Sequence, residues 1–176
     1  MKQSLGRGLI LGVLLCAACQ GNQTAYEEFS SETGNFSIDT PGTLEETQQS
    51  VETPVGPINI HTFTAESNES AYVVAYSDYP NEIVEQTDPE MLLDSSRDGA
   101  VSNLGGTLVE EETIELEGNP GRSLIIDTAA GTEEAATINS RIFLVDNRLY
   151  QILVVVPEAV EGEIDSETFL DSFELN

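Results

Sequence analysis

Apolar and polar residues alternate along much of the chain, a pattern typical of β-strands with one buried face. The alternation, and the turn residues between the alternating segments, predict strands over residues 34–39, 58–63, 71–76, 108–116 and 122–127. Residues 44–51 are more polar and only weakly patterned, which indicates an edge strand. The chain is therefore expected to build a sheet.

Two later segments are richer in apolar residues than the others. Residues 137–145 and 149–156 contain many Val, Ile and Leu residues, and Asp146-Asn147-Arg148 joins them as a tight turn. Strands that are covered on both faces lose their polar alternation. These two strands are therefore expected to lie at the centre of the sheet.

Local signals predict one long helix that starts after Asp88 and ends at Gly105-Gly106. Asp88 is a favourable N-cap residue and Pro89 suits the first helical position. Apolar residues then recur at helical spacing, at Leu93, Ala100 and Leu104. A shorter closing helix is expected over residues 167–173. Strands and two helices, linked mostly by hairpins, predict a single α+β domain around a mostly antiparallel sheet.

The start of the chain has the features of an export signal. Lys2 and Arg7 precede an apolar stretch of ten residues, Leu9–Ala18, which is shorter than the roughly 20 residues of a membrane span. Small residues then precede Cys19. The segment Leu15-Cys16-Ala17-Ala18-Cys19-Gln20 resembles the lipobox of bacterial lipoproteins, although Cys16 stands where Leu is usual.

The lipobox resemblance implies that residues 1–18 are a lipoprotein signal peptide and that Cys19 carries acyl chains such as palmitate. Two or three acyl chains give a lasting membrane anchor. Residues 19–28 would then be a tether and residues 29–176 the folded domain, on the extracytoplasmic face of a membrane, in the periplasm or on the thylakoid lumen side. The alternative is a secretory signal cleaved after Ala18, which leaves Cys19 unmodified.

The charge of the chain is strongly negative. The sequence has 32 Asp and Glu against 6 Lys and Arg, a formal net charge of −26. Nucleic acid and an anionic bilayer surface are therefore excluded as direct partners, since both require clustered Lys and Arg. Residues 19–176 hold all 32 acidic residues, four Arg and no Lys, which gives −28. The acidity indicates either a site for cations or a basic partner, or an adaptation to high salt, and the even spread of the acids favours adaptation to salt.

Residues that could carry chemistry are few. His61 is the only His, and both Cys lie in the first 19 residues, so a zinc site lacks ligands and His61 is expected to be an ordinary strand residue. A carboxylate site with His61 for Mn or Zn is the alternative. The acidic segment Asp127–Glu134 suits Ca²⁺ by composition but lacks the spacing of a calcium loop, which favours solvated surface. Arg122 and Arg141 are expected to pair with neighbouring acids, with an anion site as the alternative. No phosphate loop or nucleophile motif occurs, so we predict no catalytic residue and no cofactor.

Several segments together resemble one protein family. They are Phe36-Ser37-Ile38-Asp39-Thr40-Pro41, Gly118-Asn119-Pro120-Gly121-Arg122, the strand pair that holds Arg141 and Tyr150-Gln151-Ile152, and Phe169-Leu170-Asp171-Ser172-Phe173. In their order and spacing they are similar to the PsbP-like group, an α/β/α sandwich shared with Ran-binding proteins of the Mog type. One departure is Gly42-Thr43-Leu44 after the first Pro, where many members carry Trp.

The PsbP-like resemblance implies an accessory or assembly role and no catalysis. Members are commonly extracytoplasmic lipoproteins or thylakoid-lumen proteins, and some bind photosystem II. We therefore expect a lipid-anchored protein that binds another membrane or exported complex, associated with a photosystem if the source is phototrophic. The alternative is a module of the cell envelope that binds a small molecule or a metal ion. A concave apolar pocket with convergent polar groups would favour the alternative, and a flat apolar patch would favour a protein partner.

Overall fold

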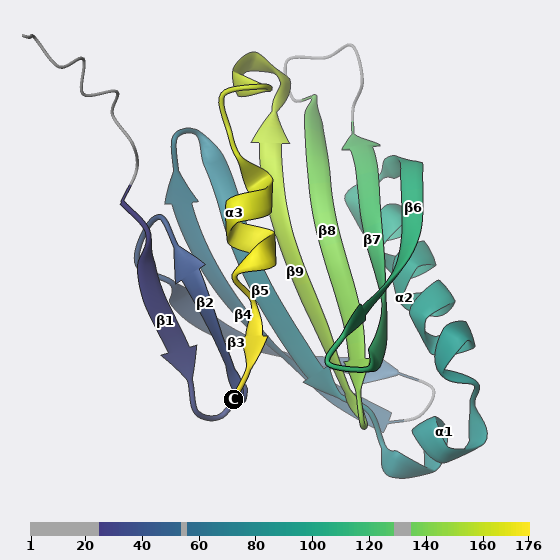
Figure 1. Ribbon diagram of the computed structural model, residues 1–176. Helices are drawn as coiled ribbons and strands as arrows, with labels where there is room; N and C mark the ends of the chain where they lie inside the picture. The colour runs from purple at the N-terminus through teal and green to yellow at the C-terminus, as the bar shows by residue number, and fades with distance from the viewer. Residues whose placement is uncertain (1–24, 54–55, 129–134) are drawn as a thin grey trace, which may run out of the picture.

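The computed structural model describes residues 25–53, 56–128 and 135–176. Over these residues the chain forms a seven-stranded sheet, a three-stranded sheet, three α-helices and one turn of 3₁₀-helix (Figure 1). In chain order the elements are β1 (Glu27–Ser31), β2 (Phe36–Thr40), β3 (Glu45–Thr53), β4 (Gly56–Ser67), β5 (Ser70–Asp78), α1 (Asn81–Gln86), α2 (Pro89–Leu104), β6 (Gly106–Leu116), β7 (Asn119–Thr128), β8 (Ala136–Val145), β9 (Arg148–Pro157), η1 (Glu158–Val160), α3 (Ser166–Asp171) and β10 (Glu174–Leu175).

The large sheet is antiparallel throughout, with the strand order β3-β4-β5-β9-β8-β7-β6. The apolar strand β9 is central and β8 lies beside it, which confirms the position predicted from their loss of alternation. The polar strand β3 lies at one edge, as its composition predicts. These positions and the helices confirm the predicted α+β fold.

Helix α2 starts and ends where its capping residues predict. The Asp88 side chain accepts a hydrogen bond from the backbone N–H of Glu90 at 2.9 Å, and Pro89 is the first helical residue. Gly105 ends the helix with a φ of 60°, in the left-handed conformation that glycine adopts without strain.

Helices cover both faces of the large sheet. Helix α2 packs against β6, β7 and β8 on one face, while α3 packs against β8 and β9 on the other (Figure 1). The small sheet, in the order β1-β2-β10, lies beside α3 on that second face (Figure 1). Its residue Phe36 contacts Phe63 of β4 and Tyr150 of β9, with ring centroids 5.4 and 6.4 Å apart.

The large sheet separates two apolar cores. The core on the α3 side includes Phe36, Phe63, Tyr72, Ile152 and Phe169. The core on the α2 side includes Leu93, Leu124, Ile126, Ile138 and Ile142. All ten side chains are buried, so both layers are held by the transfer of apolar surface out of water. In the described parts of the chain, no helix has the length and apolarity needed to cross a bilayer.

The structure differs from the sequence-based expectation in the place of one strand, the start of the folded body and an additional helix. Strand β2, expected within the main sheet, belongs to the small sheet. Strand β1 begins at Glu27, so the tether predicted over residues 19–28 loses its last two residues to the folded body. Helix α1 was not expected, because its apolar residues, Ile83 and Val84, are adjacent and give no helical spacing.

Candidate functional site

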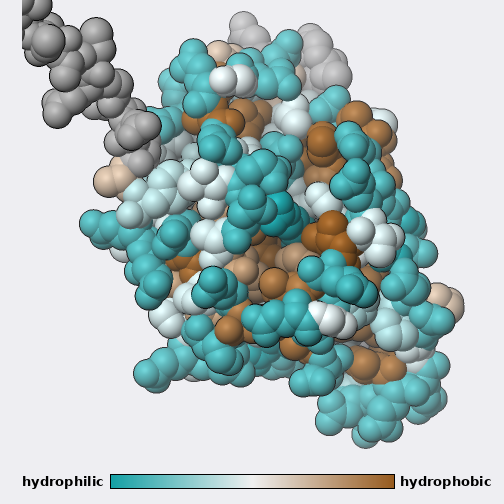
Figure 2. Space-filling model, viewed as in Figure 1, coloured by the Kyte–Doolittle hydropathy of each residue, from teal (hydrophilic) through white to brown (hydrophobic). Residues whose placement is uncertain are grey.

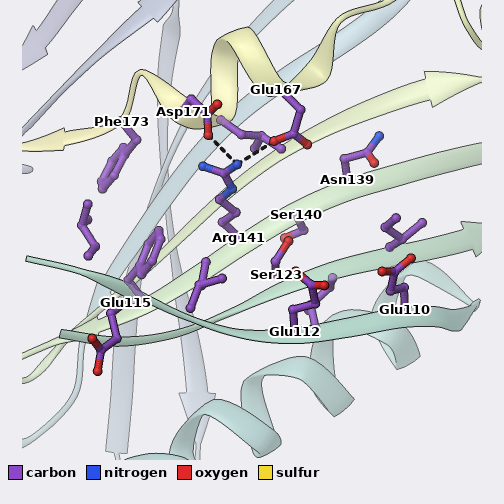
Figure 3. Close-up of a pocket in the computed structure, with 16 residues that line it drawn as sticks. Glu110, Glu112, Glu115, Ser123, Asn139, Ser140, Arg141, Glu167, Asp171 and Phe173 are labelled. Carbon is purple, nitrogen blue, oxygen red and sulfur yellow. Dashed lines mark hydrogen bonds and ion pairs between the residues drawn. The ribbon is translucent and has the colours of Figure 1, made fainter. Parts of the chain in front are cut away.

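A groove lies on the α3 side of the large sheet, where the covering layer stops short of the sheet edge. Helix α3 contacts β8 and β9, whereas α2 on the opposite face reaches out to β6 and β7. The space between α3 and strands β6–β8 has a volume of about 450 Å³ (Figure 3). We call this space the α3 groove. Figure 2 shows apolar surface at the bottom of a hollow on this face, with hydrophilic side chains around it.

One end of the α3 groove is apolar. Its walls come from the C-terminal half of β6, from β8 and from α3 and the residues that follow it, and they consist of Ile114, Leu116, Phe143, Leu170 and Phe173. The rings of Phe143 and Phe173 are stacked, with centroids 6.4 Å apart and planes at 6°. Both rings are buried against the core, so this end is preorganised by packing.

The other end of the α3 groove is acidic. Glu110 and Glu112 of β6 line it together with Ser123 of β7 and Asn139 of β8 (Figure 3). Both glutamates are exposed. We refer to these two ends as the apolar end and the acidic end of the groove.

A β-bulge places the two glutamates in the groove. Leu108 pairs with Ile126 and Glu110 pairs with Ile125, so Val109 is an extra residue on β6. Leu108 packs into the core on the α2 side, whereas Ile114 packs into the core on the α3 side. An extra residue exchanges the faces of all side chains that follow it. Glu110 and Glu112 therefore face α3.

Arg141 of β8 connects the sheet to α3. Its Nη2 atom lies 2.6 Å from Oε2 of Glu167 and 2.6 Å from Oδ1 of Asp171, which are one helical turn apart on α3 (Figure 3). The side chain of Arg141 is 20% exposed, and both carboxylates are about two-thirds exposed. The pairing with acids that the sequence predicts for Arg141 is confirmed.

Replacing Arg141 with glutamine is expected to lower the free energy of unfolding by about 1 kcal/mol, because two solvent-screened ion pairs are lost and two like charges are left one turn apart. Hydrogen exchange measured by mass spectrometry should show faster exchange in residues 166–173. Arg148→Gln is the matched control, since Arg148 pairs with Asp78 and does not contact α3. Unchanged exchange of α3 in Arg141→Gln would show that the ion pairs do not hold the helix.

Arg122 lies on the opposite face of the sheet, beneath α2. Its side chain is only 8% exposed, and its Nη2 atom donates a hydrogen bond to Oε2 of Glu90. Nη2 also lies 3.5 Å from Oδ1 of Asp94, and Nε lies 3.2 Å from Oε1 of Glu111. Arg97 of α2 shares two of these carboxylates, with Nη1 3.2 Å from Asp94 and 3.0 Å from Glu111. We call these residues the α2 ion network. Arg122 is therefore paired with acids, as predicted, and three carboxylates occupy the positions that a bound anion would need.

His61 is a strand residue whose ring is covered by neighbours. It stacks on Tyr76 with centroids 4.6 Å apart, and its Nδ1 lies 3.1 Å from Oε1 of Glu46. The guanidinium of Arg148 also lies over the Tyr76 ring, at 4.4 Å, and its hydrogen bonds lower the pKa of Asp78. Among residues 25–53, 56–128 and 135–176, no three His, Cys, Asp or Glu side chains gather as metal ligands do. His61 lies on strand β4, as the sequence predicts, and its stacking on Tyr76 was not predicted.

Two predicted sites fall outside the described residues. Cys19, the predicted lipidation site, precedes them. The acidic segment Asp127–Glu134 is described only at its start, where Asp127 accepts a hydrogen bond from the Thr137 hydroxyl at 3.2 Å. The calcium alternative for this segment therefore remains a prediction.

Sequence comparisons find no match for this chain, either among models of known protein families or among curated proteins. Solved structures do match. The solution structure of cyanobacterial PsbP (CyanoP) from Synechocystis sp. PCC 6803 has a TM-score of 0.58 and 12% identity, covering 92% of this chain and 99% of that protein. The chain has a PsbP-like fold. A Pseudomonas aeruginosa protein of unknown function, described as a putative regulator, matches at a TM-score of 0.39 and 8% identity, covering 76% of this chain and 84% of that one. That score is too low to indicate a shared fold.

The PsbP-like fold confirms the architecture that the sequence motifs imply. At 12% identity the similarity extends to the fold and not to particular residues. The α3 groove was not predicted from the sequence, because its acidic end depends on the bulge at Val109. Three consecutive glutamates at residues 110–112 indicate only a charged surface when the faces of the strand are unknown.

Proposed function

We propose that the chain is a lipid-anchored, non-catalytic accessory protein that binds another exported or membrane protein through the α3 groove. The groove carries this proposal, because Ile114 and Leu116 are only partly buried and leave apolar surface accessible beside a fixed set of polar groups. The PsbP-like fold supports an accessory role, by the resemblance discussed above. In a phototrophic source the partner would be a component of a photosystem.

The groove also favours a second candidate function. A concave site of about 450 Å³ lies within the size range of small-molecule pockets, roughly 300–1,000 Å³. Apolar walls and acidic groups would suit a small organic cation. In this case the protein would be a binding module of the cell envelope.

The full chain, captured from its native membrane in its native salt, tests the protein-binding function. We expect one complex to be enriched with the wild-type protein and to be depleted with a Cys19→Ser variant, which lacks the anchoring residue. Recovery of the same background from both proteins would contradict the proposal. Capture without any protein, but with a bound small amine found by mass spectrometry, would favour the second function.

Membrane anchoring is tested separately by fractionation. Cys19→Ser should move the protein from the membrane fraction to the soluble extracytoplasmic fraction and abolish labelling by palmitate, because the acylated thiol is lost. Cys16→Ser is the matched control and should remain in the membrane and be labelled. Equal fractionation of the two variants, or an intact Met1 in the mature protein, would contradict lipidation at Cys19.

A further inference from the structure

The α3 groove has a direction, because its two ends differ in chemistry along one strand. Ile114 and Leu116 lie toward the β6–β7 turn. Glu110 and Glu112 lie further back along β6 (Figure 3). A strand advances about 3.3 Å per residue. The carboxylate-bearing position 112 is therefore about 7 Å from position 114 and about 13 Å from position 116 along the strand.

The glutamates on the two faces of β6 differ in their ion pairing. Glu111 faces α2 and contacts both Arg97 and Arg122. Its neighbours Glu110 and Glu112 face the groove, and within the described chain neither takes part in an ion pair. Glu111 thus has two cationic partners, whereas Glu110 and Glu112 have none among the residues that the structure describes.

The rest of the groove does not supply a cation for Glu110 and Glu112. Four carboxylates line the groove, on Glu110, Glu112, Glu167 and Asp171, against one guanidinium. Glu115 also borders the groove, but it alternates with Ile114 and Leu116, so its carboxylate points away from α3 (Figure 3). That guanidinium belongs to Arg141, which already bridges Glu167 and Asp171. A positively charged group from outside the chain would complement the acidic end, while an apolar group would fill the other end.

We infer that the α3 groove binds an extended protein segment in which Lys or Arg stands two to four residues from an apolar side chain. This inference rests on the proposed function and names the chemistry of its partner. The spacing follows from the 7–13 Å between the two ends, because an extended segment beside β6 advances by the same rise per residue. A small cation would satisfy only the acidic end.

A short synthetic peptide tests the inference. The probe is a dye-labelled pentapeptide with Leu first, Lys third and fifth, and Ser between, and its binding is followed by fluorescence anisotropy and by amide NMR shifts. We expect saturable binding with shifts confined to β6, β7, β8 and α3. A peptide with Glu in place of Lys should not bind, and one with Ser in place of Leu should bind about fivefold more weakly.

Two double variants with the same change in net charge provide the matched comparison. Glu110→Gln with Glu112→Gln should weaken binding of the probe about five- to tenfold. Glu82→Gln with Glu85→Gln on α1 removes two exposed charges far from the groove and should change binding less than about twofold. The circular dichroism of both variants should match that of the wild type.

Three outcomes would overturn the inference: no saturable binding of the probe, equal weakening by both double variants, or binding of n-butylammonium as tight as that of the peptide. The native capture experiment separates this failure from failure of the proposed function. If the complex is still captured by the Glu110→Gln and Glu112→Gln variant, the protein binds a partner by another surface. The accessory, partner-binding role then stands, and the assignment of the α3 groove as the binding surface is wrong. Failure to capture any complex with the wild-type protein would contradict the accessory role itself.

Discussion

Replacing Arg122 with methionine is expected to lower the free energy of unfolding by about 2–3 kcal/mol. Removing one partner from a buried ion pair costs about 3–5 kcal/mol, because the remaining charge is left buried without a counter-charge. The value is reduced here because Glu90 and Asp94 are about half exposed and water screens them. Glu111, which is 25% exposed, would be left with Arg97 as its counter-charge.

Urea unfolding monitored by circular dichroism measures this effect. In a thermal melt of the same variant, the melting temperature should fall by about 5–10 °C for a chain of this length. Arg97→Met is the control from the same α2 ion network, and it should cost about 1 kcal/mol because its side chain is 20% exposed against 8% for Arg122. An Arg122→Met variant within about 0.5 kcal/mol of the wild type would show that the guanidinium serves no structural purpose.

The second large effect is a dependence of stability on salt. Raising NaCl from about 0.05 M to about 2 M should raise the melting temperature by on the order of 10 °C, because screening weakens the repulsion among carboxylates. The formal net charge of −26 sets the size of this repulsion. All four Arg of the described residues are already paired with acids, so the other carboxylates have only solvent cations to neutralise them.

Neutralising exposed acids separates charge screening from the general effect of salt on apolar surface. A variant with six exposed glutamates changed to glutamine, at residues 52, 66, 82, 85, 161 and 163, should show a clearly smaller rise over the same range of salt. An unchanged melting temperature of the wild type would remove the interpretation of the acidity as an adaptation to salt. An equal rise in both proteins would assign the effect to apolar burial.

The sequence predicts those parts of the fold that depend on local signals. Alternation predicts most of the strands, and Asp88, Pro89 and Gly105 predict the limits of α2. The small sheet was not predicted because it depends on distant pairing: Leu175, at the end of the chain, pairs with Phe36. Two residues of β10 carry too little pattern to indicate a strand.

The same distinction applies to the candidate site. Pairing of Arg141 with acids could be predicted from composition, but its partners on α3 could not, since they lie 26 and 30 positions away in the chain. Leu108 and Ile114 are separated by an even number of positions, so a regular strand would place both side chains on one face. The structure places them on opposite faces, because Val109 adds one residue to the ladder.

The bulge at Val109 lets β6 carry one residue more than its pairing with β7 requires. The Val109 side chain is 58% exposed, so its identity is only weakly constrained. Deleting this one residue would place Leu108 directly before Glu110, opposite the consecutive residues Ile126 and Ile125 of β7. Strand β6 would then be regular, with Leu108 and Ile114 still on opposite faces and Glu111 still on the face of Arg122. During evolution, both substitution and loss of residue 109 should therefore be tolerated, since the faces of the strand on either side of it stay in phase when it is absent.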